Sequence, residues 1–227
     1  MLQIYGVPFS AHTRKVILAA RHKGLGYEIV PTVPLNPPEN WRELSPTGKI
    51  PVLADGNFTL PDSSVICAYL EKKVPTPSLY PAGPRDYARA LWLEEFVDSG
   101  LQQHVLEGFL LEVIFAPLFL NKETNWDKVN ESLEVHIPAA FAYLENQTGG
   151  ADFLAGSTLT VADIALTSIL INYSYGGQTI DASRYPNLAA YFQFMLRHET
   201  VSAILREEVG AASQIAGMKT EFLSDVL

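Results

Sequence analysis

The chain has 227 residues, and its 48% hydrophobic and 18% charged content is that of a globular protein with a sizeable core. A net charge of −9, with no cluster of lysine and arginine, argues against binding to nucleic acid or to an anionic membrane surface. The single cysteine, Cys67, excludes an internal disulfide and indicates a reducing compartment, which we expect to be the cytoplasm.

The N-terminal third has the pattern of a small α/β unit. The first ten residues lack the pattern of a secretory signal, and residues 2–5 predict a short strand. Ser10 precedes an amphipathic helix that ends at Lys23-Gly24, and residues 27–30 predict a second strand. A strand–helix–strand unit of this length implies that the two strands are parallel.

The stretch 48–70 combines a bend, a hairpin and a helix start. The Ile50-Pro51 bond can be cis at modest cost, and a cis bond redirects the backbone ahead of the next strand. Asp55-Gly56 lies between two short apolar runs, which is typical of a tight hairpin. Helical spacing of apolar residues then predicts a helix that begins near Ser63.

This helix start has the chemistry of a receptor for an α-amino acid. Free N–H groups at a helix N-terminus attract a carboxylate, and Asp62 beside them can hold an ammonium group. The bend leaves the backbone of Ile50 open to pair with an extended peptide, as an added strand would. Asp62 and Ser63 could equally serve as an ordinary N-cap.

The rest of the chain is helical in pattern. Residues 74–84 contain four prolines and predict a linker, because proline interrupts both helices and central strands. Thr160 and Asp163 form a capping-box pattern ahead of an apolar helix, and we interpret both as structural. No membrane span is expected, since no apolar run is long enough. The helices are expected at residues 86–106, 107–120, 129–146, 160–172, 188–198 and 201–209.

Four motifs in this order resemble those of cytosolic glutathione transferases. They are SPTGKIPVL (45–53), LPDSSVICAYL (60–70), LTVADIAL (159–166) and YPNLAAYFQFMLRHETV (185–201). The resemblance implies an α/β thioredoxin-like N-terminal domain that binds glutathione, an all-α C-terminal domain that supplies most of a second-substrate pocket, and a homodimer. The corresponding divisions are a first domain at 1–75, a linker at 76–85, a helical domain at 86–210 and a C-terminal tail at 211–227.

The resemblance also assigns roles to individual residues. Pro51 would be a cis-proline, and the backbone of Ile50 would pair with the cysteinyl part of glutathione. Asp62 and Ser63 would take the γ-glutamyl ammonium and carboxylate, as the local chemistry also indicates. Lys49 lies near the expected place of the glycyl carboxylate, although it could be a solvated surface charge.

Two hydroxyl groups compete to stabilise the glutathione thiolate. A free thiol has a pKa of about 8.5, and a hydroxyl donor together with a helix N-terminus can supply the stabilisation that favours the thiolate at neutral pH. Ser10 matches the serine-type members of the family and Tyr5 matches the tyrosine-type members, and we favour Ser10. The residues after Ser10 depart from the common pattern, which leaves backbone N–H groups or Thr13 as contributors.

Other candidates are weaker. His12, Phe109, Phe115 and Tyr173 are candidate second-substrate residues, although aromatic residues at helical spacing are more often core. The histidines lack a ligand spacing, so no metal site is expected, and Cys67 is interpreted as a buried structural residue. Asp98 could reach the glutathione of a partner subunit.

The sequence therefore predicts a glutathione transferase that directs the glutathione thiolate at an electrophilic, largely apolar molecule. Two alternatives remain open. The chain could be a glutathione-dependent disulfide or peroxide reductase, or a non-catalytic binding protein on the same fold. Glutathione would be a co-substrate in either enzyme, with no metal cofactor.

Overall fold

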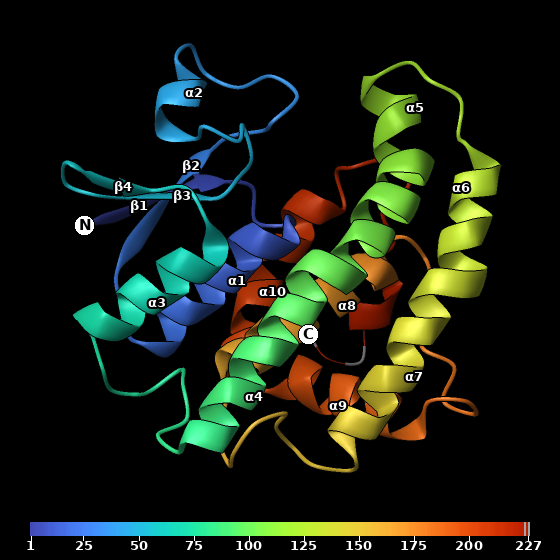
Figure 1. Ribbon diagram of the computed structural model, residues 1–227. Coiled ribbons are helices and arrows are strands. Elements are labelled where there is room, and N and C mark those ends of the chain that lie inside the picture. The colour runs from blue at the N-terminus through green and yellow to red at the C-terminus, as the bar shows by residue number, and fades with distance from the viewer. Residues whose placement is uncertain (225, 227) are drawn as a thin grey trace.

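A four-stranded mixed sheet forms the N-terminal part of the protein and is followed by a helical region (Figure 1). The computed structural model describes residues 1–224 and 226. The sheet has the order β2-β1-β3-β4, and this arrangement confirms the predicted α/β thioredoxin-like part and helical part. The strands are β1 (Leu2–Gly6), β2 (Tyr27–Pro31), β3 (Val52–Asp55) and β4 (Phe58–Leu60).

The strand register determines which loops meet. β1 pairs with β2 in parallel and with β3 antiparallel, and Tyr5 lies opposite Val52 in the second pair. The β3–β4 hairpin turns at Gly56, whose φ of +62° is accessible to glycine at little cost. Because β1 and β3 run in opposite directions, the loop after β1 lies beside the bend that precedes β3.

Helices cover both faces of the sheet (Figure 1). Helix α1 (Ala11–His22) and helix α3 (Ser63–Lys73) lie on one face, where the side chains of Leu2 and Ile4 are buried in the core that includes both helices. The short helix α2 (Trp41–Leu44) lies on the other side, and its Trp41 ring is 6.1 Å from the ring of Tyr5.

A continuous helical run begins the second part of the protein. It consists of α4 (Pro84–Glu95), the π-helical stretches η1 (Phe96–Leu101) and η2 (Gln103–Phe115), and α5 (Ala116–Phe119). The expected break between residues 106 and 107 is wrong, because the backbone stays helical through this region. A π-helical turn contains an extra residue and shifts the apolar face, so a 3.6-residue period is lost across it.

Helix α8 (Val161–Tyr175) packs against α1, α4 and α9 (Pro186–Arg197), and all of its residues are buried. Thr160 N–H donates to Asp163 Oδ2 at 2.8 Å in a capping box that starts this helix. None of the helices among the described residues is long and apolar enough to cross a membrane. The other elements are α6 (Trp126–Glu131), η3 (Ser132–His136), α7 (Ile137–Thr148), α10 (Glu199–Ala212) and η4 (Glu221–Leu223).

A buried ion pair joins the two parts. Arg14 of α1 donates to both carboxylate oxygens of Glu208 in α10, at 2.8 Å and 2.5 Å, and both side chains are at most 1% exposed. Arg14 also donates to Asn172 Oδ1 at 2.9 Å, and Tyr175 donates to Glu208 at 2.6 Å. These contacts fix α1 against α8 and α10.

The C-terminal segment folds back on the helical region. Lys219 N–H donates to the carbonyl of Tyr175 at 2.8 Å, and the ring of Phe222 lies 5.5 Å from the ring of Tyr175. Leu223 is 1% exposed. The segment therefore belongs to the packed structure around the end of α8.

Candidate functional site

Three chain segments meet at one end of the N-terminal sheet. They are the loop from β1 to α1, the bend before β3, and the start of α3. The pairing of Tyr5 with Val52 brings the first two together, and His12 of α1 contacts Ser63 of α3. Two helix N-termini and a bent peptide segment therefore surround one place on the surface.

The loop after β1 presents the hydroxyl of Ser10 at the start of α1. Ser10 is the half-buried N-cap residue, and its Oγ accepts from the N–H of Thr13 at 3.5 Å. The first N–H groups of any helix lack partners within the helix, so the amides of Ala11 and His12 add positive potential beside this hydroxyl. Ser10 and these amides together can stabilise an anion.

Tyr5 is positioned differently. Its ring is half-buried and packs against Trp41 of α2, on the sheet face opposite α1. The next residue, Gly6, allows α1 to approach the strand closely, because a Cβ at this position would lie 2.4 Å from Thr13 Oγ1. The hydroxyl groups of Ser10 and Tyr5 therefore lie on different sides of the end of β1.

The bend is held by hydrogen bonds that leave Ile50 free. The Ile50–Pro51 peptide bond is cis, as expected from the sequence. Ser45 Oγ donates to the carbonyl of Lys49 at 2.7 Å, and Trp41 Nε1 donates to the carbonyl of Gly48 at 3.2 Å. Within the described residues, neither the N–H nor the C=O of Ile50 forms a hydrogen bond, so both can pair with an extended peptide.

The start of α3 supplies the polar groups on the other side. Asp62 is the exposed N-cap, and its Oδ1 accepts from Val65 N–H at 3.0 Å. Ser63 is 6% exposed, and its Oγ is 3.4 Å from His12 Nδ1. Lys49 is exposed on the bend. Among the residues that the structure describes, the second oxygen of Asp62 has no partner and can hold a cation, while the first α3 amides can receive a carboxylate.

A buried set of charges lies behind these residues. Lys15 of α1 is 1% exposed, forms ion pairs with Asp98 of η1 and with Glu94 of α4 (2.5 Å), and donates to Ser64 Oγ at 2.8 Å. Burial would lower the pKa of Lys15, but the Asp98 and Glu94 carboxylates raise it above its usual value. Sequence reasoning missed this set, because nothing local pairs α1 with α4 and η1.

Asp98 faces side chains of its own chain. The sequence left open that it could reach the glutathione of a partner subunit, and within the described chain its side chain is 12% exposed and faces Lys15 and His12. Its Oδ1 is 3.7 Å from His12 Nδ1. Burial lowers the pKa of His12, and the charge of Asp98 opposes this effect.

The aromatic candidates divide into two groups. Phe109 and Tyr173 are 2% and 8% exposed, and their rings pack edge to face inside the helical core with their centroids 6.2 Å apart. Most of the surface of both side chains is covered by packing within the helical core. Phe115 is half-buried, and its ring stacks on that of the exposed Phe119 with the ring centroids 5.9 Å apart. Phe115 is therefore nearer to the protein surface than Phe109 and Tyr173.

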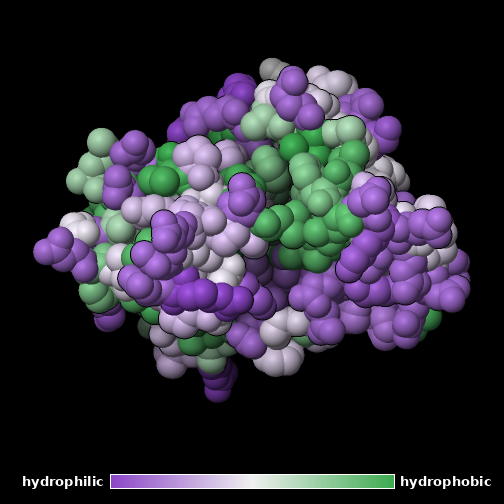
Figure 2. All heavy atoms as spheres, turned by 90° about the horizontal axis from the view of Figure 1, so that it is seen from above, coloured by the Kyte–Doolittle hydropathy of each residue, from purple (hydrophilic) through white to green (hydrophobic). Residues whose placement is uncertain are grey.

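Apolar side chains gather on the face between the two parts of the protein. Figure 2 shows this hydrophobic area beside a hollow, with hydrophilic regions on either side. The end of α5 contributes exposed side chains to the surface of the molecule, with Leu118, Phe119 and Leu120 between 44% and 54% exposed. Such an area can receive an apolar ligand.

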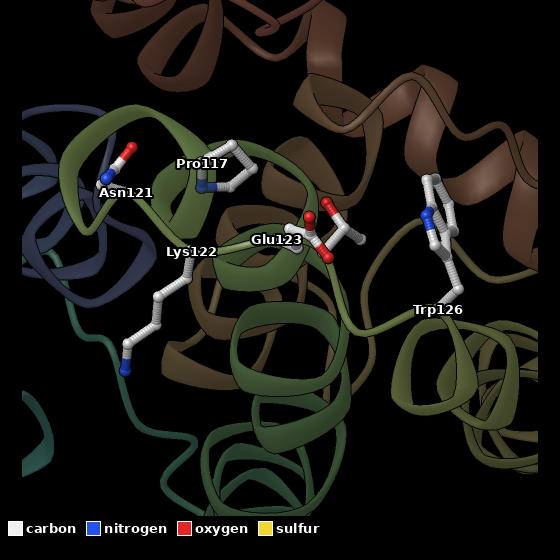
Figure 3. Close-up of a pocket in the computed structure, with 6 residues that line it drawn as sticks. Pro117, Asn121, Lys122, Glu123 and Trp126 are labelled. Carbon is white, nitrogen blue, oxygen red and sulfur yellow. The ribbon is translucent and has the colours of Figure 1, made fainter.

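A separate cavity lies in the turn between α5 and α6. It has a volume of about 650 Å³ and is lined by Pro117, Asn121, Lys122, Glu123, Thr124 and Trp126. Figure 3 shows the side chains of Lys122 and Trp126 pointing in different directions rather than converging on a common point. None of its lining residues belongs to the three segments described above.

Metal and thiol chemistry receive little support from the described residues. Across residues 1–224 and 226, no group of three or more His, Cys, Asp or Glu side chains could hold a metal ion. Cys67 is fully buried in α3, and this burial raises the pKa of its thiol to about 12. Cys67 is therefore a packing residue rather than a nucleophile.

Comparisons with known proteins agree with this geometry. Residues 4–78 match the N-terminal domain of glutathione S-transferases, and residues 111–208 match their C-terminal domain. The chain is 29% identical over 200 residues to glutathione S-transferase D7 of Drosophila melanogaster, covering 85% of this chain and 83% of that protein. A glutathione S-transferase of Triticum aestivum is 29% identical over 195 residues, covering 82% of this chain and 84% of that protein.

The fold is also similar to that of a solved glutathione S-transferase structure. The crystal structure of a glutathione S-transferase from Sinorhizobium meliloti superposes with a TM-score of 0.84 at 21% identity, covering 96% of this chain and 95% of that one. The chain therefore belongs to the glutathione S-transferase family. The class of enzyme that these matches indicate is a transferase.

Proposed function

We propose that this protein binds glutathione where its three segments meet and directs the thiolate at an electrophilic, largely apolar second substrate. The observation that carries the proposal is the cis Ile50–Pro51 bend with a free Ile50 backbone, set beside the starts of α1 and α3. One extended tripeptide with a carboxylate at each end fits this combination of groups.

The orientation of glutathione follows from charge. The γ-glutamyl carboxylate would lie at Ser63 and the first amides of α3, with its ammonium group at Asp62. The cysteinyl backbone would pair with Ile50, and the glycyl carboxylate would lie toward Lys49. This direction places the thiol toward the start of α1.

Ser10 is proposed as the group that stabilises the thiolate. Lowering a thiol pKa by one unit requires about 1.4 kcal/mol of preferential stabilisation of the thiolate. A hydroxyl donor together with a helix N-terminus can supply this amount. Ser10 combines both at the start of α1, whereas Tyr5 packs against Trp41.

The second substrate would enter between the α1 start and the helical region. In this proposal residues 1–75 bind glutathione, residues 76–85 link the two domains, and residues 86–210 supply most of the second site. Phe115 and the exposed end of α5 are its proposed apolar wall. A panel of apolar electrophiles, disulfides and peroxides distinguishes transfer from the alternative reductase activity.

Calorimetry with glutathione tests the binding site directly. We expect Ser63→Ala to weaken binding roughly tenfold, as the loss of one hydrogen bond to a charged group does. Ser99→Ala is a matched control, because Ser99 is exposed and its Oγ donates to the Glu95 carbonyl. No binding of glutathione by the unmodified protein at millimolar concentration contradicts both enzyme readings and leaves the non-catalytic binding protein as the alternative.

The protein is further proposed to form a homodimer in the cytoplasm. Large apolar side chains are exposed on α4 and on the N-terminal part, with Trp92 at 53%, Val65 at 51% and Phe58 at 50%. A second copy could cover these side chains. Light scattering gives the mass in solution, and a monomer at micromolar concentration contradicts this part of the proposal.

A further inference from the structure

His12 lies between two polar side chains from different helices. Its Nδ1 is 3.4 Å from Ser63 Oγ at the start of α3 and 3.7 Å from Asp98 Oδ1 in η1. Its side chain is 27% exposed, so part of the ring faces solvent. Among the described residues, Nε2 of His12 forms no hydrogen bond.

Asp98 has one satisfied and one unsatisfied oxygen. Its Oδ2 pairs with Lys15 Nζ and accepts from Ser64 Oγ at 3.3 Å. Its Oδ1 is buried without a hydrogen-bond partner among the described residues, and His12 Nδ1 is close to it. A buried carboxylate oxygen without a donor is costly, so this arrangement favours a proton on Nδ1 of His12.

The two ring nitrogens then have different tasks. A neutral imidazole with its proton on Nδ1 donates one hydrogen bond and has no net charge. A second proton, at Nε2, makes the ring an imidazolium. Because Nδ1 lies 3.4 Å from Ser63 Oγ, this positive charge would lie beside an anion bound at Ser63.

We propose that His12, oriented by Asp98, is a further contact for the γ-glutamyl carboxylate of glutathione and takes up a proton when that carboxylate binds. This inference rests on the glutathione site proposed above and adds a binding residue to it. The ligand chemistry is that of a carboxylate beside the α3 start, next to Ser63.

Charged groups of both signs surround His12 before the ligand binds. Lys15 on α1 and Lys49 on the bend oppose its protonation, while Asp98 on η1 and Asp62 before α3 favour it. Burial is the largest effect and keeps the pKa of His12 below its usual value. An added carboxylate raises that pKa, so binding takes up protons and weakens as the pH rises through the same range.

Calorimetry with S-methylglutathione tests this inference, because this ligand has no thiol proton to release. Titrations at pH 6.5 in buffers of different ionisation enthalpy give the number of protons taken up. We expect a net uptake of protons by the unmodified protein and almost none by His12→Gln. The matched control is His104→Gln, which lies on η2 and should keep the full uptake.

The outcomes separate the two proposals. No binding of S-methylglutathione by the unmodified protein contradicts the glutathione site itself. Binding without proton uptake, or the same uptake in His12→Gln, overturns the role of His12 and leaves the site in place. Affinity that falls from pH 6 to pH 8 in the unmodified protein but stays flat in His12→Gln supports the inference independently.

Discussion

Ser63 Oγ, at the first residue of α3, lies 3.4 Å from His12 Nδ1 in the first turn of α1. This contact brings two helix N-termini to one place, and each contributes unpaired amides and positive potential. Glutathione carries a carboxylate at its γ-glutamyl end and a thiol that must become an anion. The contact therefore joins the place proposed for recognition to the place proposed for activation.

The capping residue of α8 should be important for stability. Asp163 accepts from Leu154 N–H and the Tyr191 hydroxyl on Oδ1, and from Thr160 N–H and Oγ on Oδ2. In Asp163→Asn the new NH₂ group must face donors whichever way the amide is turned. We expect a loss of about 2–4 kcal/mol in the free energy of unfolding, measured in urea.

An exposed aspartate provides the comparison for that variant. Asp181 also accepts from a nearby N–H and hydroxyl, both of Ser183, but in a solvated turn. Asp181→Asn should leave the urea midpoint nearly unchanged. Equal midpoints for Asp163→Asn and Asp181→Asn would refute the structural role given to Asp163.

The buried Arg14–Glu208 pair predicts strong coupling between the two parts of the chain. Glu208→Gln leaves the guanidinium without its counter-charge and should cost about 3–5 kcal/mol of stability. The double variant Arg14→Leu/Glu208→Leu leaves no unpaired charge. Its loss of stability should therefore be smaller than the summed losses of Arg14→Leu and Glu208→Leu. A double-mutant cycle of unfolding free energies measures this difference, and strict additivity contradicts it.

Gly6 predicts a steric effect that can be reversed. In Gly6→Ala the added methyl would lie 2.4 Å from Thr13 Oγ1 and 2.9 Å from Thr13 Cγ2. Moving α1 away from β1 should cost about 1–3 kcal/mol. Adding Thr13→Ala removes the clashing atoms and should restore part of the thermal midpoint, whereas no restoration means that α1 is not held this close to the strand.

Much of the N-terminal site was readable because its signals are local. The cis Ile50–Pro51 bend, the hairpin at Gly56 and the α3 start at Ser63 each depend on a few adjacent residues, and all three are found in the structure. The fold class followed from the order of these elements. The same local chemistry placed a carboxylate site at the helix start.

The remaining features depend on contacts between distant segments. Lys15 and Asp98 form an ion pair although they are 83 positions apart in the sequence, so no local pattern could predict their contact. Phe109 and Tyr173 have the same pattern as pocket residues, but tertiary packing buries them. The π-helical stretches hid the continuity of the helix from residue 84 to residue 119, because they disturb the helical period.

Cys67 should be unreactive in the folded protein. Burial raises its thiol pKa to about 12, so the thiolate is scarce at neutral and mildly basic pH. We expect Ellman's reagent to modify Cys67 at pH 8 in denaturant but very slowly in buffer. Modification at the rate of a free thiol in buffer would show that Cys67 is accessible.

The most direct test of the central claim is the pKa of the thiol of bound glutathione, followed by thiolate absorbance in a pH titration. The unmodified protein should hold this pKa about one unit or more below that of free glutathione. Ser10→Ala should raise it toward the free value, and Tyr5→Phe should leave it nearly unchanged. A rise in Tyr5→Phe with no change in Ser10→Ala would contradict the assignment of Ser10.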